Sequence, residues 1–317
     1  MMNLTFRPAV AADVRRLSKL VDMAYAPVVR RLYGDSPRGR WVHYEEEKVL
    51  QYLDREGEGV RVGEWQGHTL TFCVCRAYGH FGWFHSLAVH PDYQRRGLGR
   101  QAVADAEAYL WRQGVQRIHL MTWPEATQNL GFYQALGYAA AGISLFAYRR
   151  TDSPLPDAPP QMTAHTFARL DARAQDAALA AIDALGQDVG AGAAYAPWVA
   201  WTQRQQQGDT LLVWRQERLL GMALTYWRRQ ANWLEGKALL ISPAATAAEQ
   251  AGVLEAARAW AAAKGRGSLG FPIDLMDARA MALLHRYGFR LFGDSMITLA
   301  RGADAAPHGI HLVRFGG

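Results

Sequence analysis

The chain has 317 residues, enough for two domains; half of them are apolar and a fifth are charged, which excludes a largely disordered protein. Of the six surplus positive charges, five lie within residues 1–150, where 19 basic side chains stand against 14 acidic ones, and this favours an anionic ligand in that half. No apolar run is long enough to span a membrane and the N-terminus lacks the apolar core of a signal peptide, so we expect a cytoplasmic protein with no membrane segment.

The first 60 residues predict a strand and two helices. Leu4–Arg7 is expected to be a strand, and apolar side chains at helical spacing predict a helix over Ala11–Ala26, which Pro27 is expected to end. The segment that follows is irregular and rich in Arg, Tyr and Trp. A second helix is predicted over Glu45–Arg55.

The rest of the first half alternates between strands and helices. Cys73 and Cys75 lie on one predicted strand, and neighbours two residues apart are badly placed to bridge each other, so we expect buried, reduced thiols and no metal site. The predicted elements are a hairpin of Val60–Trp65 and Leu70–Arg76, a strand at Trp83–His90, a helix at Gly97–Gln113, a strand at Arg117–Trp123, a helix at Ala126–Leu136 and a strand at Ser144–Arg149.

A strand, a glycine-rich basic turn and the start of a helix follow one another around residue 95. Gly97 and Gly99 let backbone N–H groups converge, the helix terminus supplies partial positive charge, and Arg95 and Arg96 neutralise oxyanions. The succession predicts an anion site. The alternative is a basic surface turn that caps an ordinary helix.

Prolines divide the chain after residue 150. Thr151–Gln161 contains four prolines and predicts a semi-rigid linker, because proline cannot continue a helix or a central strand. The predicted organisation is a first domain over 1–150, a second over 162–302, and an irregular tail over 303–317.

The second half repeats the first in weak form. Leu239–Pro243 echoes Leu87–Pro91 at an offset of 152, and Gly288-Phe289 echoes Gly137-Tyr138 at an offset of 151. Two anchors with nearly equal offset indicate tandem copies of one fold. After Pro243 the arginine pair and the paired glycines are missing, so the second copy is expected to have lost the anion site.

The stretch Gln94–Gly99, Gln-Arg-Arg-Gly-Leu-Gly, resembles the acetyl-CoA-binding segment of the GNAT superfamily of N-acetyltransferases, whose pattern is Gln/Arg-x-x-Gly-x-Gly/Ala. The glycine patterns of dinucleotide-binding folds and P-loops do not occur. The resemblance implies two tandem GNAT folds of α/β type with a mixed sheet, the second degenerate, and acetyl-CoA as cofactor. It places the coenzyme against Leu87, Ala88, Val89, Gln94, Arg95, Arg96, Gly97, Leu98, Gly99, Arg100, Asn129 and Phe132.

A second motif suggests a catalytic acid. Asn129–Tyr138 resembles the family's N-x-x-F-Y-x-x-x-G-F/Y helix, in which the tyrosine of many members protonates the departing thiolate. The resemblance gives this role to Tyr133; the alternative is an aromatic side chain that packs the helix on the sheet. In the second copy Leu284 stands at the matching place.

The candidate base is His85, which precedes Leu87 by two residues and is therefore expected on the same face of the strand. The segment from His85 to His90 resembles the H-x-L-A-V-H segment of arylalkylamine acetyltransferases, and histidine titrates near neutrality. The alternative is a packing or substrate-binding histidine, and Glu64 is a distant substitute. Other members carry a glutamate where this chain has Trp83.

The resemblance also implies an acceptor wall formed by the first two helices and their connection, with the aromatic candidates Tyr25, Tyr33, Trp41, Tyr44 and Trp83. The predicted function is direct transfer of acetyl from acetyl-CoA to a primary amine of a small molecule or peptide. The second copy is expected to shape the acceptor cleft or to form a homodimer. Two alternatives are a non-catalytic acyl-CoA sensor and an aminoacyl-tRNA-dependent transferase. No nucleic-acid partner is expected, because the chain has no basic-aromatic stripe.

Overall fold

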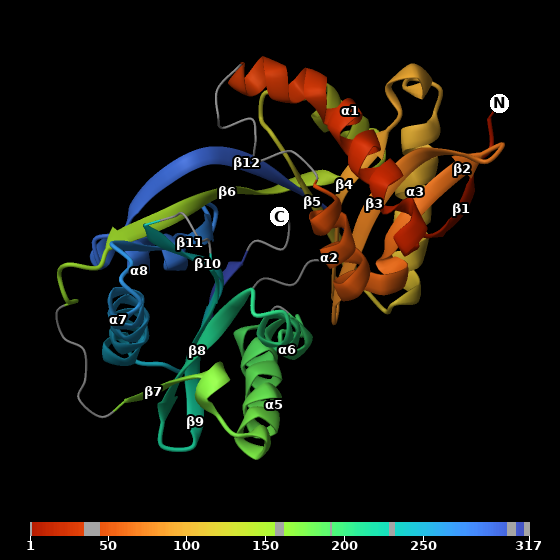
Figure 1. Ribbon diagram of the computed structural model, residues 1–317. Coiled ribbons are helices and arrows are strands. Elements are labelled where there is room, and N and C mark those ends of the chain that lie inside the picture. The colour runs from red at the N-terminus through yellow and green to blue at the C-terminus, as the bar shows by residue number, and fades with distance from the viewer. Residues whose placement is uncertain are drawn as a thin grey trace. The chain divides into compact units, whose positions relative to one another are not determined.

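The computed structural model describes residues 2–34, 45–155, 162–190, 192–227, 232–302 and 309–313. They form two compact α/β units (Figure 1). The first unit contains residues 2–140 and 299–302, and the second contains 141–298 and 309–313. The chain therefore leaves the first unit before the predicted linker and returns to it near its end. Among the described residues no helix combines the length and apolarity needed to cross a bilayer.

The first unit is built on a mixed sheet, as predicted. From β1 to β4 neighbouring strands are antiparallel, and β4 and β5 are parallel. Cys73 and Cys75 lie in this sheet as free, buried thiols. The strands, in sheet order, are β1 (Thr5–Pro8), β2 (Val60–Trp65), β3 (His68–Tyr78), β4 (Phe81–Val89) and β5 (Arg117–Thr122), and the end of β12 (Arg290–Gly302) follows β5.

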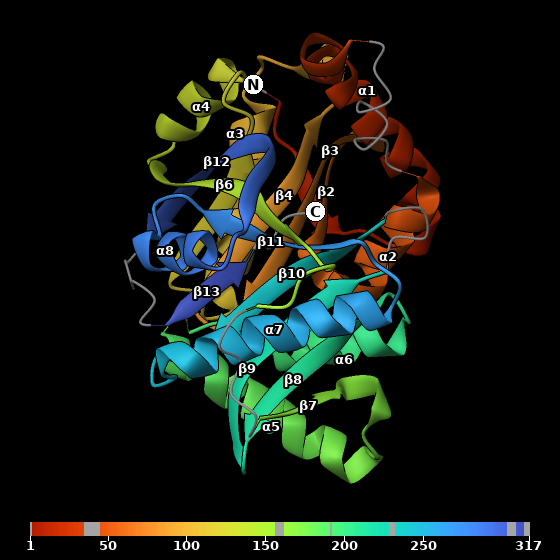
Figure 2. The same cartoon turned by 90° about the vertical axis from the view of Figure 1, so that its left-hand side faces the viewer.

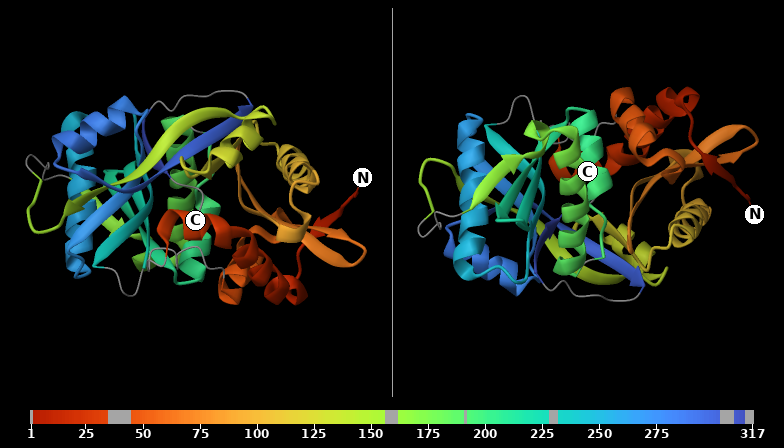
Figure 3. Two further views of the ribbon diagram at one scale, coloured as in Figure 1. Left: turned by 90° about the horizontal axis from the view of Figure 1, so that it is seen from above. Right: turned by 90° about the horizontal axis from the view of Figure 1, so that it is seen from below.

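Helices cover both faces of this sheet (Figure 3). The helices α1 (Val14–Tyr33) and α2 (Glu46–Glu56) pack on one face, while α3 (Leu98–Arg112) packs on the other and α4 (Thr127–Gln134) follows β5. Apolar side chains of α1 at helical spacing are buried against the sheet, and they account for the predicted first helix: Val14, Leu17, Leu20 and Val21.

The prediction that Pro27 ends the first helix is wrong, since α1 continues through it to Tyr33. A proline inside a helix removes one N–H donor, here the one that would reach the carbonyl of Met23. The helix nevertheless runs without interruption on both sides of Pro27. The loss of a single bond is therefore tolerated, and the helix gains nearly two further turns.

The second unit has the same arrangement. The helices α5 (Ala172–Val189) and α6 (Ala196–Arg204) lie on one face of its sheet, and α7 (Ala247–Ala263) lies across the other, with α8 (Ala278–Arg286) next to the sheet (Figure 2). In sheet order its strands are β6 (Ala139–Arg150), β11 (Ser268–Asp274), β10 (Trp233–Ile241), β9 (Arg218–Tyr226), β8 (Gly208–Arg215) and β7 (Thr163–Thr166), and β13 (Ile310–Val313) pairs with β10.

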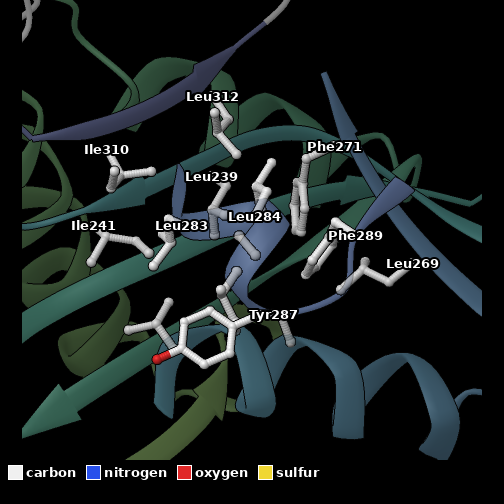
Figure 4. Packing of buried hydrophobic residues seen from close by; sticks show 14 of the residues in the cluster. Leu239, Ile241, Leu269, Phe271, Leu283, Leu284, Tyr287, Phe289, Ile310 and Leu312 are labelled. Atoms are coloured by element: carbon white, nitrogen blue, oxygen red, sulfur yellow. The ribbon is translucent and has the colours of Figure 1, made fainter. Parts of the chain in front are cut away.

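A buried apolar cluster joins α7, α8 and the strands of the second unit (Figure 4). Leu239 and Ile241 of β10, Phe271 of β11 and Leu312 of β13 contribute side chains that are almost fully buried. Residues 310–313, within the segment expected to be irregular, are thus a strand that belongs to the core.

Candidate active site

A cavity of about 590 Å³ lies in the first unit where β4 and β5 separate. The parallel pairing of the two strands extends only from Phe81–Trp83 on β4 to Arg117–His119 on β5. Beyond this pairing, residues of both strands line the cavity, and α1, α3 and α4 supply its other walls. The backbone groups of β4 that no longer pair with β5 can bind a ligand that enters between the strands.

The predicted anion loop forms one end of this pocket. Gly97 precedes α3 with φ +83° and Arg95 has φ +59°, so the chain turns sharply and the N–H groups of the first turn of α3 have no partner within the helix. Gln94 stabilises the loop, because its Nε2 donates a hydrogen bond to the carbonyl of Val89 over 3.1 Å. Arg95 and Arg100 line the pocket and add positive charge.

Three of the residues predicted to contact the coenzyme do not line the pocket. Arg96 places its guanidinium over the ring of Tyr93, 5.2 Å from the centroid. Leu98 and Ala88 are buried in the core, where Ala88 packs against the helices α1 and α2. The other nine predicted contacts line the pocket: Leu87, Val89, Gln94, Arg95, Gly97, Gly99, Arg100, Asn129 and Phe132.

Gly99 allows α4 to approach α3 closely. A Cβ at this position would lie 3.3 Å from Cζ of Phe132, which is tighter than ordinary contact. Asn129, which lies three residues before Phe132 in α4, donates from Nδ2 to Oγ1 of Thr122 at the end of β5, over 3.3 Å. The two contacts hold α4 beside the opening between the strands.

Tyr133 of α4 lines the pocket within an aromatic cluster. Its ring lies 5.0 Å from that of Phe132, 6.1 Å from that of Phe84 and 6.0 Å from that of Tyr138. Burial, and then the nearby Tyr25 and Cys73, raise the pKa of the Tyr133 phenol well above its usual value. The phenol is therefore protonated at neutral pH and can donate a proton to the pocket.

His85 of β4 lines the same pocket as a neutral imidazole. Its Nδ1 lies 2.6 Å from Oγ of Ser86, and its ring meets that of Tyr52 edge-on with centroids 5.1 Å apart. Burial, and then the positive charges of Arg55 and Lys48, hold its pKa well below 6.5. Its buried Nε2 has no hydrogen-bond partner among the described residues, and in the tautomer that carries its proton on Nδ1 this nitrogen can accept a proton.

A bulge in β4 corrects the expected orientation of His85. The pairing with β3 sets His85 opposite Val74 and Ala88 opposite Phe72, with one extra residue between them on β4. Ser86 has φ +57° at this point. His85 therefore shares its face with Ala88, under α1 and α2, and lies on the opposite face from Leu87. The prediction that His85 and Leu87 share a face is wrong.

Of the aromatic candidates for the acceptor wall, Tyr25 of α1 lines the pocket, and its hydroxyl donates to the carbonyl of Leu87 over 3.2 Å. Tyr33 lies behind the lining and accepts a hydrogen bond from Nε1 of Trp123 over 3.2 Å. Trp83 is buried and stacks on His119, so it does not line the pocket. The remaining two candidates, Trp41 and Tyr44, lie outside the described residues.

The sequence analysis missed several lining residues, among them Arg31, Ser86 and Trp123. Trp123 follows β5 at the point where the strands separate, and its ring meets Tyr25 edge-on at 6.4 Å. No motif identifies these positions, although Trp123 ends a predicted strand beside the anion loop. Glu64, the substitute base, is paired with Arg7 over 2.6 Å and is not part of the lining.

In the second unit the matching gap is filled by the chain itself. β10 pairs in parallel with β11 only over Trp233–Glu235, which corresponds to the short pairing of β4 with β5. Its continuation, Ala238–Ile241, pairs instead with β13, and β13 also contacts β11. A strand therefore lies where the first unit has its pocket.

The N-terminus of α7 is also occupied, by the carboxylate of Glu249. Glu249 accepts from the N–H and the hydroxyl of Thr246, over 2.7 and 3.0 Å, and pairs with Arg215. These contacts place a carboxylate at the helix end that in the first unit faces the pocket. Leu284, the counterpart of Tyr133, is buried in the core (Figure 4). In the described residues the second copy thus lacks the open pocket and the pocket-lining tyrosine of the first.

Comparisons with known proteins find similarity to acetyltransferases. Residues 26–138 match the model of the acetyltransferase (GNAT) family. An acetyltransferase of Pectobacterium atrosepticum is 35% identical over 60 residues, and one of Yersinia pestis is 30% identical over 91 residues. These matches cover 19% and 28% of this chain. They span only 43% and 64% of the length of the two relatives.

Solved structures resemble the chain over almost its whole length. A putative acetyltransferase from Pyrococcus horikoshii has a TM-score of 0.62 at 14% identity, and the match covers 98% of this chain and 95% of that one. A tandem GNAT protein from the clavulanic acid biosynthesis pathway has a TM-score of 0.59 at 14% identity, over 95% and 99% of the two chains. At such low identity these likenesses show the fold, two tandem GNAT units, and nothing further.

Proposed function

Since the chain carries a domain of the GNAT acetyltransferase family within residues 26–138, we propose that it transfers an acetyl group from acetyl-CoA to a primary amine. One observation carries this proposal. The anion loop, the separated end of β4, the neutral His85 and the protonated Tyr133 all open onto one pocket. The pocket thus combines a diphosphate site with an acid and a base.

The residues present suit coenzyme A. The first turn of α3 and the side chains of Arg95 and Arg100 would hold its diphosphate, because converging N–H groups and cations bind oxyanions. The backbone of β4 between Leu87 and Val89, which does not pair with β5, would hold the pantetheine arm. When bound, the coenzyme supplies a thioester whose carbonyl carbon accepts a nucleophile.

In this reaction His85 would accept one proton and Tyr133 would donate another. The acceptor nitrogen forms a bond to the carbonyl carbon while the bond from that carbon to sulfur breaks. Nε2 of His85 takes the proton that the nitrogen loses, directly or through one water molecule. The hydroxyl of Tyr133 gives its proton to the departing thiolate and regains one from solvent. The lowered pKa of His85 and the raised pKa of Tyr133 keep each group in the form that its role requires.

An assay of free thiol release with acetyl-CoA and a panel of primary amines tests this proposal. We expect turnover by the wild-type chain and a loss of kcat of about 10²- to 10⁴-fold in Tyr133→Phe, because that variant keeps the ring but lacks the proton. Tyr93→Phe serves as the matched control, since Tyr93 lies beside the anion loop but outside the lining.

Two outcomes would contradict it. Tight binding of coenzyme A without turnover of any amine would favour the acyl-CoA sensor. Full activity of Tyr133→Phe would remove the phenol from the mechanism while leaving the acetyltransferase assignment intact.

A further inference from the structure

The wall of the pocket opposite the anion loop ends in a positive charge. Ala24, Val28 and Arg31 recur at spacings of four and three along α1, so they share one face of the helix, and all three line the pocket together with Tyr25. Arg31 lies six residues beyond Tyr25, about 9 Å along the helix axis. The side chains of a helix lean toward its N-terminus, and the guanidinium of Arg31 therefore leans toward Tyr25.

The guanidinium of Arg31 is available for a ligand. Its side chain is exposed, and none of the described residues forms an ion pair or hydrogen bond with it. In the described part of the chain the charged side chains that line the pocket are Arg31, Arg95 and Arg100. Arg95 and Arg100 belong to the anion loop on the α3 side, whereas Arg31 comes from α1 on the other side of the pocket.

From this arrangement we propose that Arg31 binds a carboxylate of the acceptor, so that the acceptor is a small amino acid with an apolar or aromatic side chain. The inference rests on the function proposed above. A guanidinium matches a carboxylate with two parallel hydrogen bonds. The rings of Tyr25 and Trp123, which meet edge-on beside it, offer an apolar surface for the rest of the molecule. With Arg95 and Arg100 paired to the coenzyme diphosphate, Arg31 is the charged side chain of the lining that faces the acceptor, and it opposes the entry of polyamines and basic peptides.

A purely structural role for Arg31 is the competing explanation. A cation in the last turn of α1 interacts favourably with the C-terminal end of the helix dipole. Arg30, also in that last turn and exposed, can serve the helix equally well but does not line the pocket. It is therefore the matched control.

The test compares kcat/KM for phenylalanine, phenylalaninamide and spermidine in four forms of the chain. We expect the wild type to prefer phenylalanine. In Arg31→Ala, kcat/KM for phenylalanine should fall at least tenfold and that for the amide should stay within twofold. Arg31→Lys should recover part of the loss, and Arg30→Ala should match the wild type for every acceptor.

Three results would overturn the proposal. One is an equal loss for phenylalanine and its amide in Arg31→Ala. Another is a wild-type preference for the amide or for spermidine, which would leave the acetyltransferase function standing. The third is weaker binding of coenzyme A to Arg31→Ala in calorimetry, which would assign Arg31 to the coenzyme. If the wild type acetylated no amine at all, the proposed function would fail first and this inference with it.

Discussion

Gly97 holds a left-handed backbone at the entrance to α3, with φ +83° and no atom within 4 Å of the place where a Cβ would stand. Its backbone conformation, and not crowding, is therefore what calls for glycine here. Gly114 at the other end of the same helix has φ +79° and the same open surroundings. The two glycines share one conformation, but only Gly97 lies on the pocket.

Replacement of each glycine by alanine distinguishes an effect on coenzyme A binding from an effect on stability. Gly97→Ala and Gly114→Ala should both lower the free energy of unfolding by about 1 kcal/mol, because alanine is strained in the left-handed region. Only Gly97→Ala should weaken coenzyme A binding, by tenfold or more in calorimetry, since it displaces the N–H groups of the anion loop. Equal affinities in the two variants would contradict the loop assignment.

The pKa of His85 gives a second prediction at this scale. The folded chain holds this imidazole neutral well below pH 6.5, whereas the unfolded chain binds a proton near 6.5, so the unfolded state takes up more protons as pH falls. The contribution of His85 to the free energy of unfolding therefore has its full value above pH 6.5 and decreases as the pH falls below 6.5.

Urea unfolding at pH 7 and pH 5 measures this contribution. The free energy of unfolding should fall more for the wild type than for His85→Gln, by at most about 1.4 kcal/mol per pH unit. His311 is also buried with its pKa lowered to about 4, but it is present in both forms and its contribution cancels. Identical slopes in the two forms would show that His85 is not held neutral.

At the scale of elements, the two units differ in what lies between their two central strands. In the first unit β4 and β5 part to leave a pocket, and in the second β13 enters between β10 and β11. The position that corresponds to His85 is Lys237, which is buried and paired with Glu235 over 2.8 Å. At this position the second copy thus has a buried ion pair where the first has a histidine that lines the pocket.

This difference predicts one coenzyme A site per chain and a structural role for Leu312. Leu312→Ala should lower the stability of the second unit by about 2–5 kcal/mol, because the side chain is 1% exposed in the core. The same substitution at Leu291, which is 44% exposed, should cost less than about 0.5 kcal/mol. Neither change should affect the affinity for coenzyme A, and calorimetry should give one site in both variants. Two sites in any form would refute the assignment of the second unit.

Motifs predicted the parts of the site that depend on local backbone. The loop Gln94–Gly99 and the helix that carries Tyr133 were found because glycine spacing and neighbouring aromatic residues are visible in sequence. The bulge at Ser86 was not, since a serine with positive φ has no local signature and the bulge exists only through pairing with β3. The strand at 310–313 was missed for a similar reason: its partner, β10, lies about 70 residues earlier in the chain.

At the scale of the whole molecule, the chain enters the first unit twice. Residues 299–302 belong to that unit, where Arg301 pairs with Glu107 over 2.9 Å and Glu107 accepts a hydrogen bond from the hydroxyl of Tyr138. Gly302 lies so close to the start of β5 that a Cβ would stand 2.3 Å from the carbonyl oxygen of Gln116. The first copy, as the sequence delimits it, is therefore structurally incomplete.

A chain cut after residue 150 tests this point. We expect it to melt at lower temperature than the N-terminal unit of the full chain and to aggregate, because β5 loses its neighbour and becomes an edge strand. Gly302→Val in the full chain should destabilise the first unit in the same direction. A fragment 1–150 that bound coenzyme A with full affinity and full thermal stability would show that residues 299–302 are dispensable.

The strand β13 also explains why the second copy could change so far. Once a peptide from the same chain supplies hydrogen bonds to Ala238–Ile241, that copy no longer needs a nucleotide to complete its sheet. The turn after Pro243 therefore needs no arginines or paired glycines, and the fold accommodates a run of small uncharged residues there, Ala-Ala-Thr-Ala-Ala.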